Sequence, residues 1–297
     1  MLVRRWLDAA GIADPVLRHC YTVCVRELAG IDGGTARWQV LRSAPAAART
    51  HMAALLAHGA RADGCADSGP VEDRQHRLAE FAEATRAAFL SGGSDDPVLH
   101  ATVHTYRTFG MPLSLIEDMF TAMQRDVDFR NFATYEELRQ WCMQMTGGLG
   151  VMFFRVTLGT ELAEAELPVR EFSVLEQMTD VLRDLSEDLD NGRLYLPLED
   201  LDQFKVRAED IKAKRWTPAM ADLIAFEAER VTDQLRNATE VEDGPASTLF
   251  QARSEHLALI IDAVLAAGQD VLRRPVQPPL RMLLNVWRPL MRAVIPC

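Results

Sequence analysis

The chain has 297 residues, 48% of them apolar, which is enough for one large domain with a buried core. Its formal net charge of −11 argues against nucleic acid and anionic membrane surfaces as partners, because both need clustered Lys and Arg. Five cysteines occur without a C-x-x-C spacing. We therefore expect reduced thiols in a cytoplasmic protein, with neither a disulfide framework nor a zinc site. No apolar run is long enough to predict a membrane span.

Strong helix formers dominate the sequence from end to end, and apolar residues recur at intervals of three and four. No run alternates apolar and polar residues over the length of a strand. Polar breaks at 67–73, 91–97, 238–247 and 273–279 are too short to be domain linkers. The sequence therefore predicts an all-α protein with a single domain over residues 1–297.

The first acidic segment in chain order is AAARTHMAALLAHGARADGCADSGP, at 46–70. Asp63 and Asp67 are four residues apart, so they lie one above the other on a helix. At about 100° per residue they continue the apolar stripe of Met52 and Leu56, which predicts that the carboxylates point inward. Burying paired carboxylates is costly without a counter-charge, and a hard cation such as Mg²⁺ would supply one.

Two features in the middle of the chain have a structural explanation. His100 and His104 have the i, i+4 spacing of a zinc site, but no HExxH motif or nearby cysteine accompanies them. The run WCMQMTGGLGVMFF at 141–154 predicts core or pocket wall, with Gly147 and Gly148 allowing helices to approach closely. It is not a phosphate loop, because no G-K-[ST] follows.

The second acidic segment is MTDVLRDLSEDLDNGRLYLP, at 178–197, where Asp180, Asp184 and Asp188 repeat at intervals of four. Like charges at that spacing destabilise a helix by roughly 0.2–0.5 kcal/mol per pair. Either this face is simply solvated, as in an ordinary surface helix, or a cation binds there. Two acidic motifs with arginines close by favour one cavity that holds metal ions and a phosphate group. The flanking arginines are Arg49 and Arg61 for the first motif, and Arg183 and Arg193 for the second.

The second segment resembles the second aspartate motif of the squalene and phytoene synthase family, approximately Q-x-T-N-I-L-R-D-x-x-E-D-x-x-x-G-R-x-Y-L-P. The 46–70 segment resembles the first motif of that family, and 109–150 resembles the segment between the two. The resemblance covers about residues 45–215. The matching elements of the second motif are Leu182-Arg183-Asp184, Glu187-Asp188, Gly192-Arg193 and Tyr195-Leu196-Pro197.

This resemblance implies the isoprenoid-synthase fold, a single large helical domain with a central pocket. It also implies that two aspartate motifs hold Mg²⁺ ions, which grip an allylic prenyl diphosphate and assist its ionisation. By position, the implied metal ligands are Asp63, Asp67, Asp184 and Asp188. The implied diphosphate-binding residues are Arg49, Arg61, Arg183, Arg193 and Tyr195.

The chain departs from the family pattern at several positions. Ala60 stands where the family usually has an arginine, and Asp180 stands where it has an asparagine. Gln144 replaces a tyrosine associated with head-to-head coupling, and an amide cannot perform the proton chemistry of a phenol. Leu56 and His58 replace bulky aromatic types and would reshape the wall of the donor pocket.

These departures favour a resemblance to the phytoene-synthase-like prenyltransferases that alkylate aromatic acceptors, such as carbazoles, in streptomycetes. We expect a short donor, dimethylallyl or geranyl diphosphate, with Asp180 as candidate base and Gln144 as candidate acceptor contact. Drift at positions that the reaction does not need explains both residues equally well.

Two other functions remain as alternatives. One is a head-to-head squalene, presqualene diphosphate or phytoene synthase. The other is a non-catalytic relative that binds prenyl diphosphate, which is disfavoured because all four core aspartates are present.

Overall fold

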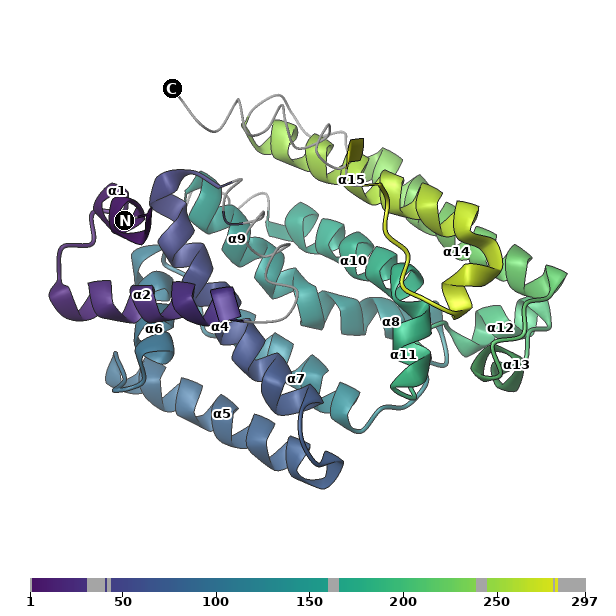
Figure 1. Cartoon of the computed structure of the whole chain (residues 1–297), viewed down its shortest axis with the longest axis horizontal. Helices are drawn as coiled ribbons and strands as arrows, with labels where there is room; N and C mark the ends of the chain where they lie inside the picture. The colour runs from purple at the N-terminus through teal and green to yellow at the C-terminus, as the bar shows by residue number, and fades with distance from the viewer. Residues whose placement is uncertain are drawn as a thin grey trace. The chain divides into compact units, whose positions relative to one another are not determined.

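A computed structural model describes residues 2–30, 41, 44–159, 166–238, 245–279 and 281–282. Every regular element within these ranges is a helix, so the all-α prediction is confirmed (Figure 1). None of the described helices is long and apolar enough to cross a bilayer.

The described residues divide into two compact units. Of the described residues, the first contains those up to Asp128 together with those of Gly148–Glu166, and the second contains Phe129–Gly147 and those from Leu167 to residue 282. A single domain over the whole length stays a prediction.

The first unit is built around α4 (Ala46–Asp67), which contacts each of the other described helices of this unit. Every residue from Thr50 to Leu55 is buried, so other helices surround this part of α4. The surrounding helices are α1 (Leu2–Ala9), α2 (Pro15–Gly30), α5 (Val71–Ser91), α6 (Pro97–Thr108), α7 (Ser114–Val127) and α9 (Gly148–Leu158).

Local signals in the sequence explain where α6 begins and how closely α9 packs against α7. Asp96 Oδ1 accepts hydrogen bonds from the backbone N–H groups of Val98, at 2.8 Å, and Leu99, at 3.1 Å, and so caps α6. A Cβ atom at Gly148 would lie 2.4 Å from the carbonyl oxygen of Leu115. Only glycine therefore lets α9 approach α7 this closely, in agreement with the expectation for Gly148.

A buried polar cluster joins α2, α4 and α6. The Tyr21 hydroxyl lies 2.8 Å from Nδ1 of His104, 3.0 Å from Nδ1 of His51 and 2.8 Å from the Thr105 hydroxyl. Burial lowers the pKa of His51 to about 4, so the imidazole is neutral near pH 7. His104 thus has the structural role that the sequence predicts for it.

The second unit contains a long helix pair, α14 (Pro218–Ala238) and α15 (Pro245–Ala267), which contact each other. Helix α12 (Leu198–Phe204) packs against α14, and the short helices α11 (Leu185–Asp190) and η2 (Gly268–Leu272) contact each other. The remaining elements are α8 (Tyr135–Cys142), the π-helical η1 (Met143–Gly147), α10 (Glu166–Arg183), α11 (Leu185–Asp190), α12 (Leu198–Phe204), α13 (Ala208–Lys212) and the 3-10 helix η2 (Gly268–Leu272).

A buried charge network ties α12 to α14. Arg230 donates to both oxygens of Asp200, at 2.9 and 3.0 Å, and to Glu227 Oε2 at 2.7 Å. The Glu227 side chain is fully buried. Burial, reinforced by the Asp200 carboxylate and opposed by Arg230, raises the pKa of Glu227 to about 8.

We expect Glu227→Gln to stabilise the protein in alkaline solution. The native state binds the Glu227 proton more tightly than the unfolded chain, so its contribution to stability is complete below about pH 4.5 and lost as pH rises through about 8. The free energy of unfolding is measured with urea for both proteins. Between those pH values it should fall in the parent protein relative to the variant, by about 1.4 kcal/mol for each unit by which the pKa of Glu227 in the folded state exceeds its pKa in the unfolded chain. Glu229→Gln, an exposed position on the same helix, is the control. An equal pH profile for the parent and Glu227→Gln would contradict this account.

Candidate active site

The second acidic segment is not one continuous helix, because α10 ends at Arg183 and α11 begins at Leu185. Between them Asp184 has φ −102° and ψ 12°. The Glu187 N–H bonds to the Asp184 carbonyl at 2.9 Å, and the Arg183 carbonyl accepts instead from the Val276 N–H at 3.0 Å. The interruption therefore depends on a segment far along the chain.

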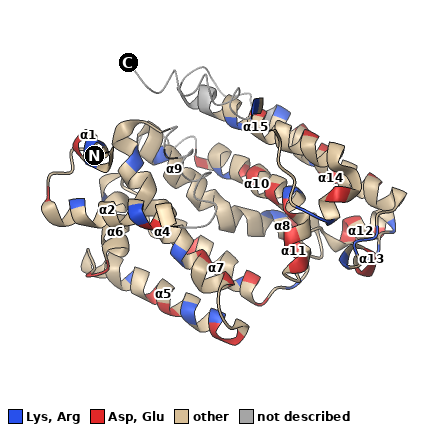
Figure 2. Cartoon of the chain, viewed as in Figure 1, with Lys and Arg blue, Asp and Glu red and all other residues tan. Residues whose placement is uncertain are grey.

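Arg183 lies between two of the stacked carboxylates. Its Nη1 is 2.7 Å from Asp180 Oδ1, and its Nε donates to Asp184 Oδ1 at 3.0 Å. The guanidinium thereby offsets the repulsion between acids spaced by four. The Asp184 side chain is 26% exposed and Asp188 is half-buried, so neither carboxylate is sealed in the core. Figure 2 shows acidic residues on α10 and α11.

Asp180 is the most perturbed acid of this segment. Burial raises its pKa to about 6, the Asp184 and Glu176 carboxylates add to the increase, and Arg183 opposes it. Although protein surrounds the carboxylate, 43% of its side-chain surface is exposed. Asp180 can therefore both reach a ligand and exchange a proton near neutral pH.

The end of this segment forms a tight turn. Gly192 has φ 78°, a left-handed conformation that favours glycine, and the Arg193 N–H bonds to the Asp188 carbonyl at 2.8 Å. The Tyr195 ring is 5% exposed and lies 4.9 Å from the Trp141 ring centroid and 6.2 Å from that of Phe132. Diphosphate binding by Arg193 and Tyr195 stays a prediction.

In the first acidic segment, Asp63 is half-buried and Asp67 is exposed. The prediction that both carboxylates point inward is therefore wrong for Asp67, because the buried stripe of α4 ends before it. Arg61 is held by two carboxylates: Nε and Nη2 donate to Glu27 at 2.9 and 2.6 Å, and Nη1 donates to Asp96 at 2.6 Å. These partners tie α4 to α2 and to the start of α6. Diphosphate binding by Arg61 would compete with them and stays a prediction.

Three further residues of the predicted site, Arg49, Leu56 and His58, also lie on α4. Arg49 donates from Nε to the Ala44 carbonyl at 2.9 Å. His58 is 2% exposed, its Nε2 lies 3.1 Å from the Thr85 hydroxyl, and burial lowers its pKa to about 4. His58 is thus a core residue, whereas Leu56 is half-buried. The predicted donor-pocket role of Leu56 and His58 is not tested by these contacts.

Gln144 lies in the π-helical turn η1 and is exposed. The Thr146 hydroxyl is 3.0 Å from both the Cys142 and Ser173 carbonyl oxygens, which anchors this turn to α10. Single π turns inside helical segments often occur at functional sites. The sequence analysis names Gln144 as a candidate acceptor contact, but it does not predict the π turn that contains this residue.

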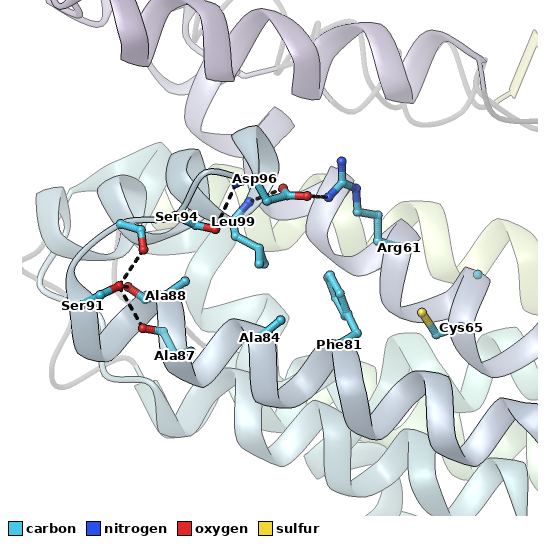
Figure 3. A pocket seen from close by; sticks show the side chains of 12 residues that line it. Arg61, Cys65, Phe81, Ala84, Ala87, Ala88, Ser91, Ser94, Asp96 and Leu99 are labelled. Carbon is cyan, nitrogen blue, oxygen red and sulfur yellow. Dashed lines mark hydrogen bonds and ion pairs between the residues drawn. The ribbon is translucent and has the colours of Figure 1, made fainter.

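A pocket of about 710 Å³ lies beside α4 and α5 in the first unit. Arg61, its partner Asp96, Phe81 and Cys65 are among the residues that line it (Figure 3). The small side chains of α5 give it room. Neither Leu56 nor His58 lines this pocket, so it is distinct from the predicted donor pocket.

The sequence predictions did not include Glu176 and Arg253, which act on Asp180, or His256, on which Arg253 acts. Arg253, on α15, donates to Glu176 on α10, and it also opposes the increase in the pKa of Asp180. Burial, together with Arg253 and Arg183, lowers the pKa of His256 to about 4. Glu176 and Arg253 are 77 positions apart, and no motif links them, so the sequence offered no signal for this contact.

The residues that could hold Mg²⁺ are two pairs of aspartates, Asp63 with Asp67 in the first unit and Asp184 with Asp188 in the second. Within the described ranges, no group of three or more His, Cys, Asp or Glu side chains is arranged to hold a metal ion. Mg²⁺ usually binds through one or two carboxylates and completes its shell with water and substrate phosphates. Each pair therefore suits this ion.

Comparison with known proteins assigns the class. The family model of squalene/phytoene synthase matches residues 34–283, so the chain belongs to the squalene/phytoene synthase family. The predicted membership in this family of prenyl-transferring enzymes is confirmed.

The sequence is similar to several bacterial synthases. It is 30% identical over 211 residues to the bifunctional protein CrtB/UppS of Streptomyces coelicolor, covering 69% of this chain and 36% of that protein. It is 27% identical over 210 residues to a 15-cis-phytoene synthase of Synechocystis, covering 65% and 61%. The match thus spans about a third of the first relative and less than two thirds of the second. A presqualene diphosphate synthase of Rhodopseudomonas palustris is 27% identical over 253 residues, covering 84% and 90%.

Solved structures confirm the isoprenoid-synthase fold. A dehydrosqualene synthase in complex with ligand has a TM-score of 0.77 at 18% identity, covering 99% of both chains. The squalene synthase HpnC from Alicyclobacillus acidocaldarius has a TM-score of 0.68 at 24% identity, covering 89% of this chain and 96% of that chain. The closer resemblance to aromatic prenyltransferases stays a prediction.

Proposed function

We propose that this protein is an Mg²⁺-dependent prenyltransferase that ionises a short allylic diphosphate and transfers the prenyl group to an aromatic acceptor. The observation that supports prenyl transfer most strongly is the second aspartate segment. There Asp184 and Asp188 are one turn apart, and Arg183 lies against Asp184, in a chain of the squalene/phytoene synthase family. A cytoplasmic enzyme of bacterial natural-product biosynthesis fits this reading.

The four aspartates of the two motifs would hold Mg²⁺, which when bound would stabilise the negative charge of the departing diphosphate. Arg49, Arg183, Arg193 and Tyr195 would bind the diphosphate oxygens, by the family resemblance. The C–O bond to diphosphate breaks, an electron-rich ring carbon forms the new bond to the allylic cation, and the ring then loses a proton. Asp180 is the candidate acceptor of that proton, because its carboxylate is reachable and its pKa is about 6.

The aromatic acceptor is supported by Gln144, Ala60 and Asp180. At Gln144 the chain presents an exposed amide, which can hydrogen-bond an acceptor but cannot act as an acid or base. Ala60 contributes no cation to a second diphosphate site. An acceptor without a diphosphate needs neither a tyrosine at position 144 nor an arginine at position 60.

Head-to-head coupling to squalene, presqualene diphosphate or phytoene is the second candidate. The names of the relatives favour it, since they include phytoene synthases and a presqualene diphosphate synthase. The two candidates share the ionisation of the first diphosphate and differ in the nucleophile.

The experiment that tests the proposal is a donor series with a carbazole acceptor. Because donor and acceptor must share one cavity, we expect turnover to be at least about tenfold faster with dimethylallyl or geranyl diphosphate than with geranylgeranyl diphosphate, on the order of the discrimination that chain length gives. Product formation is followed by chromatography and mass spectrometry. A marked preference for the twenty-carbon donor, or no prenylated arene with any donor, would contradict the proposal.

A further inference from the structure

A second polar pocket, of about 450 Å³, lies between α1 and α2 and contains none of the residues proposed for catalysis. Its lining residues are Val3, Arg4, Leu7, Arg18, His19, Thr22 and Arg26. The set contains three arginines and a histidine, and none of these described lining residues is acidic. The lining of this pocket is therefore positively charged in a chain whose formal net charge is −11.

The basic side chains reach this pocket through their helical spacing. Arg18, Thr22 and Arg26 follow one another at intervals of four on α2, so they share a face. Elsewhere on the same helix Tyr21, Cys24, Val25 and Leu28 are buried in the first unit. Arg18 is half-buried and Arg26 is exposed, and Arg4 of α1 joins them at the pocket.

The counter-charges within reach are fewer than the cations. Arg18 is 2.9 Å from Asp8 and also donates to the Ile12 carbonyl at 2.7 Å, so its charge is offset and its position is fixed. Arg4 and Arg26 are both exposed, and neither has an ion pair with any residue that the structure describes. Among the residues that the structure describes, these two guanidinium groups at one pocket therefore have no carboxylate partner, and two like charges that line one pocket repel each other.

We propose that the α1–α2 pocket is an anion site for a phosphate or diphosphate group. Two guanidinium groups that have no ion pair within the described part of the chain match the charge of a dianion better than that of a carboxylate, and their planar forks match phosphate oxygens. The same chemistry serves a free phosphorylated metabolite or the headgroup of an anionic lipid. This site is separate from the proposed active site, because it uses no residue of either aspartate motif.

The site is tested with inorganic pyrophosphate by titration calorimetry, in EDTA, which removes the contribution of Mg²⁺ at the proposed active site. We expect the parent protein to bind, and the double variant Arg4→Gln/Arg26→Gln to bind at least about tenfold more weakly, since it loses two charge-assisted contacts. Arg18 is left intact because it fixes the chain near Ile12. The control is Arg207→Gln/Arg236→Gln, which removes the same charge from side chains that are 72% and 71% exposed in the second unit.

A parallel experiment uses vesicles of phosphatidylglycerol, compared with vesicles of phosphatidylcholine, in a sedimentation assay. Loss of pyrophosphate binding in the Arg4→Gln/Arg26→Gln variant would identify a soluble phosphate ligand, and loss of vesicle binding would identify a lipid headgroup. Either result, with the control variant unaffected, supports the site. The proposal is overturned if the parent protein binds neither probe, or if the double variant binds both as the parent does. Prenyl transfer is measured separately in Mg²⁺, so failure of one proposal does not imply failure of the other.

Discussion

Asp184→Asn is expected to lower the turnover of prenyl diphosphate by at least about two orders of magnitude while leaving the helix content unchanged. The amide keeps the size of the side chain but removes the negative charge that would hold Mg²⁺. The side chain is 26% exposed and lies between α10 and α11, so little packing is lost. Turnover is measured as diphosphate release, and helix content by circular dichroism.

Asp190→Asn is the matched control for this experiment. Asp190 ends α11, is 65% exposed and pairs with Lys214 at 2.6 Å, so the substitution removes the same charge two residues after Asp188. We expect turnover within about twofold of the parent, because an exposed ion pair contributes at most about 1 kcal/mol to stability. Full activity of Asp184→Asn, or full activity of the parent protein in EDTA, would refute the assignment of the second motif to metal binding.

Local patterns in the sequence predicted the helical fold well, because the signals that end helices are local. The breaks at 67–73 and 91–97 separate α4, α5 and α6 as predicted. Their Gly, Pro and Asp residues supply a left-handed Gly92 and the cap at Asp96. The glycines of the 141–154 run likewise predicted the close approach at Gly148.

Features that depend on distant partners could not be predicted from the sequence. The break at Asp184 exists because Val276 bonds to the Arg183 carbonyl, and no pattern within the motif encodes that bond. Arg61 lies beside the first aspartate motif, yet Glu27 and Asp96 hold its guanidinium. The position of a residue in a motif therefore identifies a candidate for the site. The side chains that bind this candidate instead of a ligand, such as Glu27 and Asp96 at Arg61, can be identified only in the folded structure.

Head-to-head coupling of two prenyl diphosphates is expected to be absent. A second diphosphate has to be bound and ionised in that reaction, and Ala60 supplies no cation where the family usually has an arginine. A missing charge-assisted hydrogen bond costs about 1.5–3 kcal/mol. Arg61, the neighbouring residue, is a poor substitute because it already makes three hydrogen bonds to Glu27 and Asp96.

The acid–base groups of the site also argue against head-to-head coupling. Gln144 stands where the family has a tyrosine, and its amide neither accepts nor donates a proton usefully. Asp180 adds a negative charge where the family has a neutral asparagine, and Arg183 is already shared between Asp180 and Asp184. A departing second diphosphate would therefore be repelled, whereas a neutral arene would meet no such cost.

Incubation of the protein with Mg²⁺ and farnesyl or geranylgeranyl diphosphate, with and without NADPH, followed by hexane extraction, tests this expectation. We expect no squalene, presqualene diphosphate or phytoene above the level given by the Asp184→Asn variant, which serves as the inactive control. Addition of an electron-rich carbazole together with dimethylallyl or geranyl diphosphate should start diphosphate release in the parent protein and not in that variant, because only an ionised donor is captured by the ring. Appreciable head-to-head product from the parent protein would instead show that Gln144 and Ala60 are compatible with a second ionisation, and would make the head-to-head synthase the better reading of this site.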